Sequence, residues 1–323
     1  MTTSAAPVSR RALLAAGACW ALQRAAPAAV AEPRAGSMIA RKSAVLPERP
    51  QRVVALEFLM AETLALLDRP PVGMSDARLY PGWIGVETDR LKNAVDVGTR
   101  QQPSLEAIAR LQPDLILGVA YRHAALFDVL AQIAPVVLFE FAPGANGGTQ
   151  LDSAFETLDI LAGITGEQTR AAGVRADAEA AFARDHARLV DAGKTGAGFV
   201  LLQELSSPDT YWAFTGGSLA AGLAERLDLR FWPQRRTRDG VRPLQSEELL
   251  ALENVDVGLI SFSGPQATLE SKTSSPVWRR TSARREGRVV LIERNIWNFG
   301  GVGSAMRLSN AMTGAVLASP TRF

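Results

Sequence analysis

The sequence predicts an α/β protein of two lobes with mainly parallel sheets, joined by a single long backbone helix. Three observations support this fold class. Short apolar strands alternate with helical segments along the chain, which is typical of parallel sheets. A helical stretch at 167–191 contains no proline and one internal glycine. One pattern occurs twice, at 104–119 and at 246–262: a serine opens a helix, an aspartate follows ten residues later, and an apolar strand comes directly after the aspartate.

The N-terminal lobe is expected over 51–165, after a polar lead-in at 32–50 that prolines interrupt. Apolar runs predict its strands, and apolar residues at helical spacing predict its helices. In chain order, we expect a strand at 52–56, a helix at 57–67, short strands at 72–74 and 95–97, a helix capped by Ser104, a strand at 115–119, a helix at 124–134, a strand at 135–139 and a helix at 152–162.

The connection between the lobes is expected at 166–193. Apolar and small residues fall close to one helical stripe there, as Val174, Ala178, Phe182 and Leu189 show. A helix of about 25 residues rises roughly 37 Å, which is long enough to cross from one lobe to the other. The alternative is a long surface helix within one domain.

The C-terminal lobe is expected over 194–323, where the alternation of strands and helices resumes. Its expected elements are a strand at 199–202, a helix at 218–227, strands at 256–262 and 288–293, and a final helix at 302–318. The sequence therefore predicts a second α/β lobe.

Residues 1–31 have the features of an export signal. Arg10 and Arg11 precede an apolar run too short to span a bilayer, and small residues at 29–31 form a cleavage site. The paired arginines resemble a twin-arginine signal, so we expect export to the periplasm. Lipid anchoring at Cys19 is the alternative. Removal of this segment takes away three arginines and no acid, which leaves a net charge of about −1.

The composition excludes several functional classes. One cysteine excludes a disulfide framework, and two histidines, His123 and His186, make a multi-histidine zinc site improbable. No lysine-rich stretch interleaves with aromatic residues, so nucleic acid is not an expected partner. The Gly-Val-Gly at 301–303 lacks the third glycine of a dinucleotide fingerprint, and only 20 residues follow it. An α/β enzyme is therefore a distant alternative.

Five segments together resemble the periplasmic substrate-binding proteins of ABC importers that have a helical backbone. The specific segments are Val-Asp-Val-Gly-Thr-Arg at 95–100 and Trp-Asn-Phe-Gly at 297–300, and 52–57, 103–106 and 113–116 add weaker matches. The likeness is greatest to the ferric-hydroxamate siderophore-binding members, and it covers roughly residues 50–318.

The resemblance implies a monomeric, non-catalytic protein that captures a ferric siderophore in a cleft between two lobes. It also implies delivery of this ligand to an inner-membrane ABC permease for iron uptake. No resident cofactor and no protein metal ligand are expected, because a siderophore already saturates its iron with oxygen ligands. The pocket instead needs aromatic faces and hydrogen-bond donors.

The resemblance assigns five ligand contacts. Arg100 follows a short strand and a glycine, at the edge where open α/β sheets bind ligands, and it matches the family arginine that contacts hydroxamate oxygens. Tyr121 and Trp83 match pocket aromatics of the family. Trp297 and Phe299 match a Trp-x-Tyr pair, with phenylalanine in place of tyrosine.

Other assignments leave alternatives open. Tyr211 and Trp212 are weaker ligand candidates, for which packing in the core is the alternative. The run at 235–242 contains four arginines and stands where the hydroxamate binders carry another tryptophan. It is expected to be a solvated loop, but if it lines the cleft it favours a carboxylate or catecholate ligand. Tyr121 with His123 keeps haem open as a ligand, and cobalamin-like chelates share the scaffold.

Acidic residues on each lobe are the expected contacts with the permease. Asp128 matches the docking acid of the N-terminal lobe in the family, and Glu247 or Glu248 is the candidate in the C-terminal lobe. For each of them, a solvated helix charge is the alternative reading.

Overall fold

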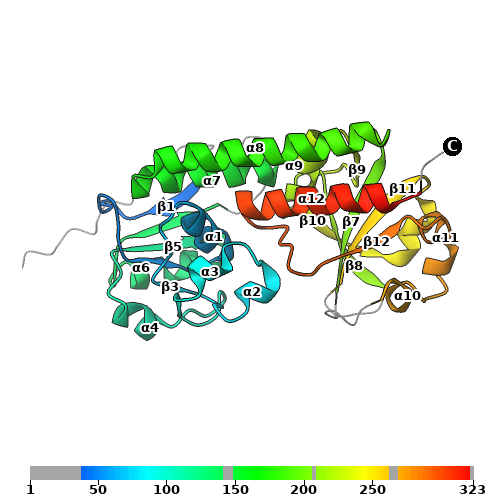
Figure 1. The fold of residues 1–323 in the computed structure, drawn as a ribbon. Coiled ribbons are helices and arrows are strands. Elements are labelled where there is room, and N and C mark those ends of the chain that lie inside the picture. Colours follow the sequence, from blue (N-terminus) through cyan, green and yellow to red (C-terminus); the bar gives the residue numbers. More distant parts are fainter. Residues whose placement is uncertain (1–37, 141–147, 206–208, 262–267, 321–323) are drawn as a thin grey trace, which may run out of the picture.

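The computed structural model describes residues 38–140, 148–205, 209–261 and 268–320. Two six-stranded sheets form two lobes, and a long helix, α8, runs along both of them (Figure 1). The predicted fold class is confirmed. The expected export signal at 1–31, with Cys19, lies outside the described residues.

The sheet of the N-terminal lobe has the strand order β1-β6-β5-β2-β3-β4, and all its pairs are parallel except β1 with β6. Its strands are β1 (Ile39–Lys42), β2 (Val53–Ala55), β3 (Gly73–Met74), β4 (Val95–Asp96), β5 (Leu115–Val119) and β6 (Val136–Phe139). Strand β1 lies within the segment expected to be a loose lead-in. It is a half-buried edge strand, and Arg41 and Lys42 hide its apolar pattern.

The helical elements of this lobe are α1 (Phe58–Leu66), α2 (Tyr80–Trp83), α3 (Thr88–Leu91), α4 (Leu105–Arg110), α5 (Ala120–His123), η1 (Ala124–Leu126), α6 (Phe127–Leu130) and α7 (Gln150–Thr165). The single helix predicted at 124–134 is wrong. The backbone at His123 and Leu126 has ψ angles of −1° and −3°, which divide this stretch into short turns.

Helix α8 (Gln168–Asp191) confirms the long helix predicted at 167–191. It is continuous through Gly173, where an added Cβ would meet no neighbouring atom. The predicted stripe is buried, including Val174, Phe182 and Leu189. The 24 residues rise roughly 36 Å, so one rigid helix contacts both lobes.

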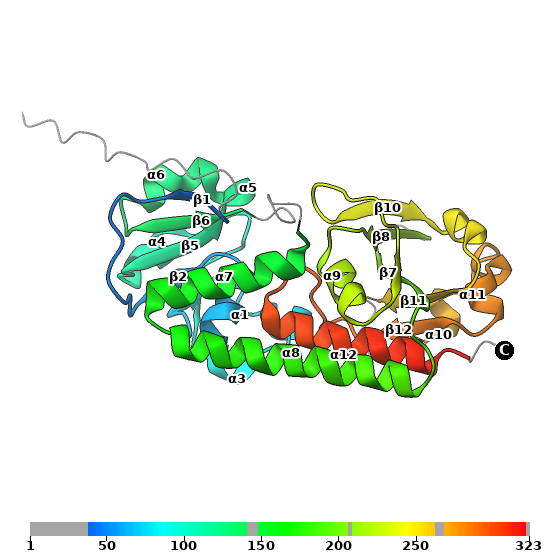
Figure 2. The same cartoon turned by 90° about the horizontal axis from the view of Figure 1, so that it is seen from above.

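Helix α12 (Val302–Ala318) lies beside α8, as Figure 2 shows from above. The Ser309 hydroxyl donates to the Asp185 carboxylate of α8 at 2.7 Å. Near the C-terminal ends of both helices, the ammonium of Lys194, which follows α8, donates to the Val316 carbonyl of α12 at 2.8 Å. The sequence predicted α12 but not this pairing. Because α12 touches both lobes, the division of the chain at 51–165, 166–193 and 194–323 stays a proposal.

The sheet of the C-terminal lobe has the order β10-β8-β7-β11-β12, with β9 also paired to β7. Strands β7, β9, β11 and β12 are parallel, and β8 pairs antiparallel with both of its neighbours, β7 and β10. Its elements are β7 (Gly198–Glu204), β8 (Thr210–Phe214), α9 (Leu219–Arg226), β9 (Arg230–Trp232), β10 (Val241–Gln245), η2 (Ser246–Ala251), β11 (Val255–Ile260), α10 (Leu269–Lys272), η4 (Trp278–Arg280), α11 (Ser282–Arg285) and β12 (Val289–Ile292).

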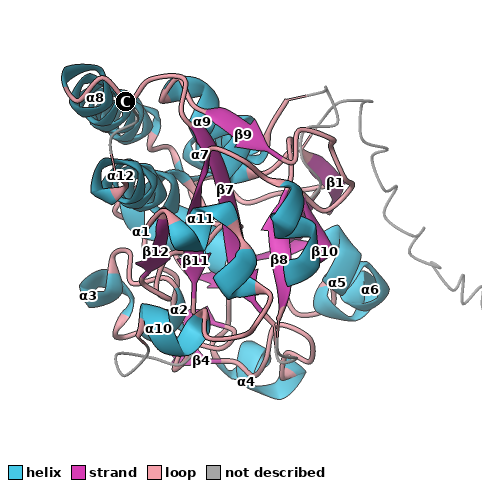
Figure 3. Cartoon of the chain, turned by 90° about the vertical axis from the view of Figure 1, so that its right-hand side faces the viewer, coloured by secondary structure: helices cyan, strands magenta, loops and turns pink. Residues whose placement is uncertain are grey.

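One apolar core cluster is continuous between the lobes. It includes α1 residues such as Phe58, stripe residues of α8 such as Phe182, α12 residues such as Leu308, and Phe199 and Leu201 of β7. Two smaller clusters, one in each lobe, include residues of β5 and β6 or of β7 and β11. Figure 3 shows α8 and α12 on one side of the molecule and α5, α6 and β10 on another. The shared core therefore joins the lobes along the helical side.

Candidate functional site

A cavity of about 430 Å³ lies between the lobes. This volume falls within the usual range of small-molecule sites. Five lining residues belong to the N-terminal lobe and five to the C-terminal lobe: Glu57, Arg100, Tyr121, Arg122 and Glu140, then Arg238, Asp239, Val241, Trp297 and Phe299. We call this cavity the cleft.

The N-terminal wall of the cleft is built at the ends of parallel strands. Glu57 follows β2, Arg100 follows β4, Tyr121 and Arg122 follow β5, and Glu140 follows β6. The carboxyl ends of parallel strands meet at one edge of a sheet, and ligands of open α/β sheets bind there. The order of the strands therefore gathers residues that are up to 83 positions apart in the sequence.

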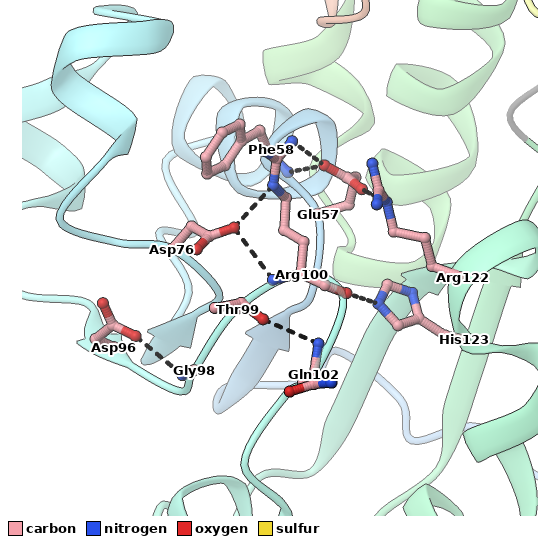
Figure 4. Close-up of polar contacts among 10 residues, drawn as sticks. All are labelled: Glu57, Phe58, Asp76, Asp96, Gly98, Thr99, Arg100, Gln102, Arg122 and His123. Carbon is pink, nitrogen blue, oxygen red and sulfur yellow. Dashed lines mark hydrogen bonds and ion pairs between the residues drawn. The ribbon is translucent and has the colours of Figure 1, made fainter.

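Arg100 is held from several sides (Figure 4). The Asp76 carboxylate accepts from the Arg100 amide at 3.1 Å and from its Nε at 3.0 Å. The Glu57 carboxylate accepts from an Arg100 η nitrogen at 3.1 Å. Below the guanidinium, the Phe58 ring centroid lies 4.0 Å from Cζ. Only 12% of the Arg100 side chain is exposed, so its orientation is fixed before any ligand arrives.

Two of the five guanidinium N–H groups of Arg100 are used by these carboxylates among the described residues. The side chain nevertheless lines the cleft. The remaining N–H groups can therefore donate to an oxygen-rich ligand without breaking either ion pair.

Glu57 joins Arg100 to a second arginine. Its other carboxylate oxygen accepts from Arg122 Nε at 3.0 Å, and the Glu57 side chain is 4% exposed. The Arg122 guanidinium lies 4.8 Å from the Tyr121 ring centroid. Desolvation, followed by the charge of Glu57, raises the pKa of Tyr121 to about 12, although the residue is 54% exposed. The Tyr121 phenol is therefore protonated at neutral pH and can donate a hydrogen bond.

The floor of the cleft is aromatic. Trp297 and Phe299 come from the connection between β12 and α12, and their ring centroids are 5.5 Å apart. Trp297 also packs edge-to-face on Phe58 of the N-terminal lobe, with centroids 6.0 Å apart, whereas Phe299 packs at a tilted angle on Phe214 of the C-terminal lobe, with centroids 5.7 Å apart. Such edge-to-face contacts stabilise aromatic pairs beyond the area that they bury. The aromatic chain thus continues across the boundary between the lobes.

The C-terminal wall includes part of the arginine-rich run at 235–242. Arg238 and Asp239 lie in the loop before β10 and line the cleft with Val241. The loop is held at its base, where Arg236 donates to the Gly148 carbonyl at 2.6 Å and the Thr215 and Thr237 hydroxyls are 2.9 Å apart. In the part of the chain that the structure describes, no ion pair forms with the Arg238 or Asp239 side chain.

Four of the predicted ligand residues come together in the cleft, namely Arg100, Tyr121, Trp297 and Phe299. Trp83 does not line the cleft; it packs edge-to-face on Trp297, with centroids 5.7 Å apart.

Tyr211 and Trp212 do not line the cleft either. Tyr211 is 3% exposed, and its hydroxyl accepts from the Trp278 indole N–H at 2.7 Å. This contact places Tyr211 in the core of the C-terminal lobe, which is the alternative that the sequence left open. Trp212, the next residue of β8, is partly buried opposite Pro243 of β10.

Sequence reasoning missed Glu57, Arg122 and Glu140 as lining residues. Each of them follows an apolar strand directly or within three residues. A charged residue shortly after an apolar strand predicts a position at the ligand-binding edge of the sheet, and we drew this inference from the sequence only for Arg100.

The predicted docking acids lie on the surface of both lobes. Asp128 of α6 has an 84% exposed side chain, which accepts from Arg41 at 2.7 Å. Glu248 of η2 pairs with Arg242 at 2.8 Å, and this hydrogen bond lowers the pKa of Glu248. Glu247 is exposed beside it. Figure 2 shows α6 and β10 on the side of the molecule away from α8.

His123 is buried and is not among the lining residues of the cleft. One ring nitrogen lies 3.0 Å from the Val119 amide, and the other lies 2.9 Å from the Arg100 carbonyl. Neither nitrogen can therefore reach an iron ion in the cleft, which argues against His123 as an axial ligand of haem. Within the described ranges, no three His, Cys, Asp or Glu side chains group as a metal site.

None of the helices in the described residues is long and apolar enough to cross a membrane.

Comparison with known proteins gives relatives over most of the chain. The chain is 27% identical over 266 residues to the Fe(3+) dicitrate-binding periplasmic protein FecB of Escherichia coli (strain K12), covering 82% of this chain and 84% of that protein. It is 26% identical over 268 residues to the iron(3+)-hydroxamate-binding protein FhuD of the same strain, covering 83% and 87%.

A solved structure agrees with both the fold and these relatives. The siderophore binding protein FhuD from Vibrio cholerae, bound to Fe3+-Desferal, superposes with a TM-score of 0.76 at 28% identity. The match covers 84% of this chain and 99% of that chain. The family model described as "Periplasmic binding protein" matches residues 53–295, well over half of the chain. The protein therefore belongs to the periplasmic binding protein family, whose members bind substrates for ABC importers.

Proposed function

We propose that this protein captures a ferric siderophore of the hydroxamate type in the cleft and delivers it to an ABC permease for iron uptake. One observation carries the proposal: a nearly buried, ion-paired arginine lines a cavity between the lobes together with an aromatic floor. The names of the relatives support the same ligand class, because one binds iron(3+)-hydroxamate and another was solved with Fe3+-Desferal.

The chemistry of the cleft suits such a ligand. Hydroxamate oxygens around Fe³⁺ carry negative charge and accept hydrogen bonds, and a planar guanidinium can donate to two neighbouring oxygens at once. Arg100 keeps N–H groups for this role, and Tyr121 adds a protonated phenol. Trp297 and Phe299 offer faces for the hydrocarbon linkers between the hydroxamates. The protein itself supplies no ligand to the iron.

The charge of the cleft favours ferric hydroxamates over ferric citrate and ferric catecholate complexes. Its lining residues contain three carboxylates, Glu57, Glu140 and Asp239, and three guanidiniums, Arg100, Arg122 and Arg238. A ferric trihydroxamate core is neutral, because three singly charged groups balance Fe³⁺. Ferric dicitrate and ferric triscatecholate are anions, and an electroneutral cleft gives them no net attraction. Arg238 lines the cleft, but Asp239 beside it offsets its charge.

The remaining parts of the proposal follow from the sequence and the family. The chain is exported by the twin-arginine route, loses residues 1–31 and works in the periplasm as a monomer without catalysis. Asp128 and Glu247 or Glu248 meet the permease, one acid on each lobe. The exposure of these acids supports this role, because surface charges steer encounter.

The test is a binding panel on residues 32–323. Tryptophan fluorescence is titrated with ferric desferrioxamine B, ferric dicitrate, a ferric triscatecholate and haem, and iron-free desferrioxamine B is the control. We expect ferric desferrioxamine B to bind most tightly and its iron-free form to bind weakly. Tighter binding of haem or ferric dicitrate would reject the hydroxamate assignment, and no binding of any ferric siderophore would reject the function.

A further inference from the structure

His123 lies behind the cleft wall, where the loop that carries Arg100 meets the end of β5. It is fully buried, at 0% exposure. Its Nδ1 is 3.0 Å from the Val119 amide nitrogen, and its Nε2 is 2.9 Å from the Arg100 carbonyl oxygen. Figure 4 shows the ring beside the Arg100 backbone, on the side away from Asp76.

These two partners fix the protonation state of the ring. A backbone amide can only donate, so Nδ1 must carry a lone pair that accepts from Val119. A carbonyl oxygen can only accept, so Nε2 must carry the proton that is donated to Arg100. His123 is therefore neutral, with its proton on Nε2.

The surrounding chain leaves little freedom for this ring. A Cβ added to Gly118 would lie 2.8 Å from His123 Nδ1 and 3.1 Å from a Leu138 methyl carbon. Glycine at 118 thus makes room for the imidazole directly beside β5. Because the ring cannot move toward β5, its hydrogen bond holds the Arg100 backbone at a fixed distance from that strand.

Arg100 is consequently held on both sides of its backbone. Asp76 accepts from its amide, and His123 donates to its carbonyl. The side-chain ion pairs with Glu57 and Asp76 then orient the guanidinium from this fixed point. Of these contacts, the one to His123 connects Arg100 to the segment directly after β5, which also carries Tyr121 and Arg122.

We propose that neutral His123 is a positioning residue for ligand binding, which fixes the Arg100 backbone relative to Tyr121 so that both donors meet one ligand. The inference rests on the proposed function for the nature of the ligand. His123 itself does not touch the ligand, since it is enclosed behind the cleft wall.

Acid should disrupt this arrangement. Burial lowers the pKa of His123; the hydrogen bond with the Arg100 carbonyl and the charge of Glu57 oppose this shift, and the charge of Arg122 adds to it. The side chains whose charge acts on the ring are Glu57 and Arg122. Protonation would add an N–H at Nδ1 that points at the Val119 N–H, and two donors cannot share a hydrogen bond. Ligand affinity should then fall in acid.

The test compares His123→Gln with the matched control His186→Gln, a partly exposed position on α8. The probe is the chromium(III) complex of desferrioxamine B, because its ligands exchange so slowly that it stays intact when the pH changes. Affinity is measured by calorimetry at pH 7. We expect His123→Gln to weaken binding about fivefold to tenfold and His186→Gln to leave it unchanged.

A double-mutant cycle separates positioning from general loss of structure. In an Arg100→Ala background, His123→Gln should cause little further loss of affinity, because the group that it positions is absent. An equal loss in both backgrounds would overturn the proposal. If His123→Gln does not fold, the pH profile of the wild type decides: its acid-side loss of affinity should be absent in Arg100→Ala, and an unchanged profile would overturn the proposal.

A measurement without ligand makes the two proposals separable. The chain contains only two histidines, so ¹⁵N NMR of the ring nitrogens can be assigned by substitution. We expect the proton of His123 on Nε2 at neutral pH and faster solvent exchange of the Arg100 Nε–H in His123→Gln. A proton on Nδ1, or unchanged exchange, would overturn the positioning role. Failure of the wild type to bind any ferric siderophore would instead overturn the proposed function.

Discussion

The two walls of the cleft are built on different principles. In the N-terminal wall, Glu57 and Arg100 are nearly buried, ion-paired and placed directly after or close to strand ends. In the C-terminal wall, Arg238 and Asp239 are exposed on a loop, and neither forms an ion pair with another described residue. The aromatic connection that carries Trp297 lies between them.

This difference suggests a division of labour. Fixed donors cost little entropy on binding, so the N-terminal wall suits the part of a ligand that never changes, the oxygens around iron. Exposed loop residues adapt more easily, so the C-terminal wall suits the variable backbone of a siderophore. The substitutions below test this division, and affinities refer to ferric desferrioxamine B.

The largest effect is expected at Arg100. Arg100→Lys keeps the positive charge but cannot contact Asp76, Glu57 and a ligand with one ammonium group. Affinity should fall by about 2–3 kcal/mol, as when a buried charged contact is truncated. Calorimetry measures the loss, and circular dichroism checks the fold. Arg238→Lys is the matched substitution on the opposite wall and should change affinity little. A larger loss for Arg238→Lys would reverse the roles of the two walls.

The second-largest loss of affinity is expected from substitutions in the aromatic floor. Trp297→Ala removes a face that lines the cleft and should weaken binding by about 1–2 kcal/mol, a usual value for an aromatic anchor. Trp83→Ala should have a smaller effect, because Trp83 acts through its contact with Trp297. Calorimetry is used, since both changes alter the fluorescence.

Tyr211→Phe is the control within the core of the C-terminal lobe. It leaves the buried Trp278 N–H without its acceptor, so it should lower the free energy of unfolding by about 1 kcal/mol or more. Ligand affinity should not change. Weaker binding by Tyr211→Phe with unchanged stability would return Tyr211 to the list of ligand contacts.

The contact between α1 and the start of α12 contains a buried carboxyl group, that of Glu62. Glu62 of α1 accepts from the Ser304 amide at 2.6 Å and from the Gly301 amide at 3.2 Å, at the start of α12. Burial raises the pKa of Glu62 despite these hydrogen bonds. The folded chain therefore binds this proton more tightly than the unfolded chain does.

Glu62 should make stability depend on pH. Its contribution is present at low pH and is lost as the pH rises through the raised pKa. Urea unfolding between pH 5 and 8 should show this loss in the wild type and a flatter profile in Glu62→Gln, which carries no charge at any pH. Parallel profiles would mean that Glu62 does not titrate in this range.

The smallest effect on affinity is expected at the docking acids. Each exposed charge contributes at most about 1 kcal/mol to a contact, so we expect a combined effect on encounter with the permease. A variant with Asp128→Asn, Glu247→Gln and Glu248→Gln should bind its ligand normally and reduce iron uptake by cells, most clearly at low salt, where exposed charges are least screened. Unchanged uptake would show that these acids are not the docking contacts.

Much of the fold follows from local sequence patterns. The long helix α8 could be predicted from two local features, the absence of proline and one stripe of apolar residues, because both occur within residues 167–191 of the sequence. The strands β5, β7 and β11 are short apolar runs, which are typical of strands buried on both faces. Strands β1 and β10 escaped prediction because edge strands are only half buried and carry charged residues.

The sequence by itself also determined that Arg100 would stand beyond a strand end, because a short strand and Gly98 precede it. Only the tertiary structure decided which other residues join it. Strand order is set by long-range pairing, so it brought Glu57 and Arg122 to Arg100. In the same way, packing turned Tyr211 into the core and His123 behind the wall. A local pattern records which residues follow a strand, whereas the direction of each side chain depends on neighbours that are distant in the sequence.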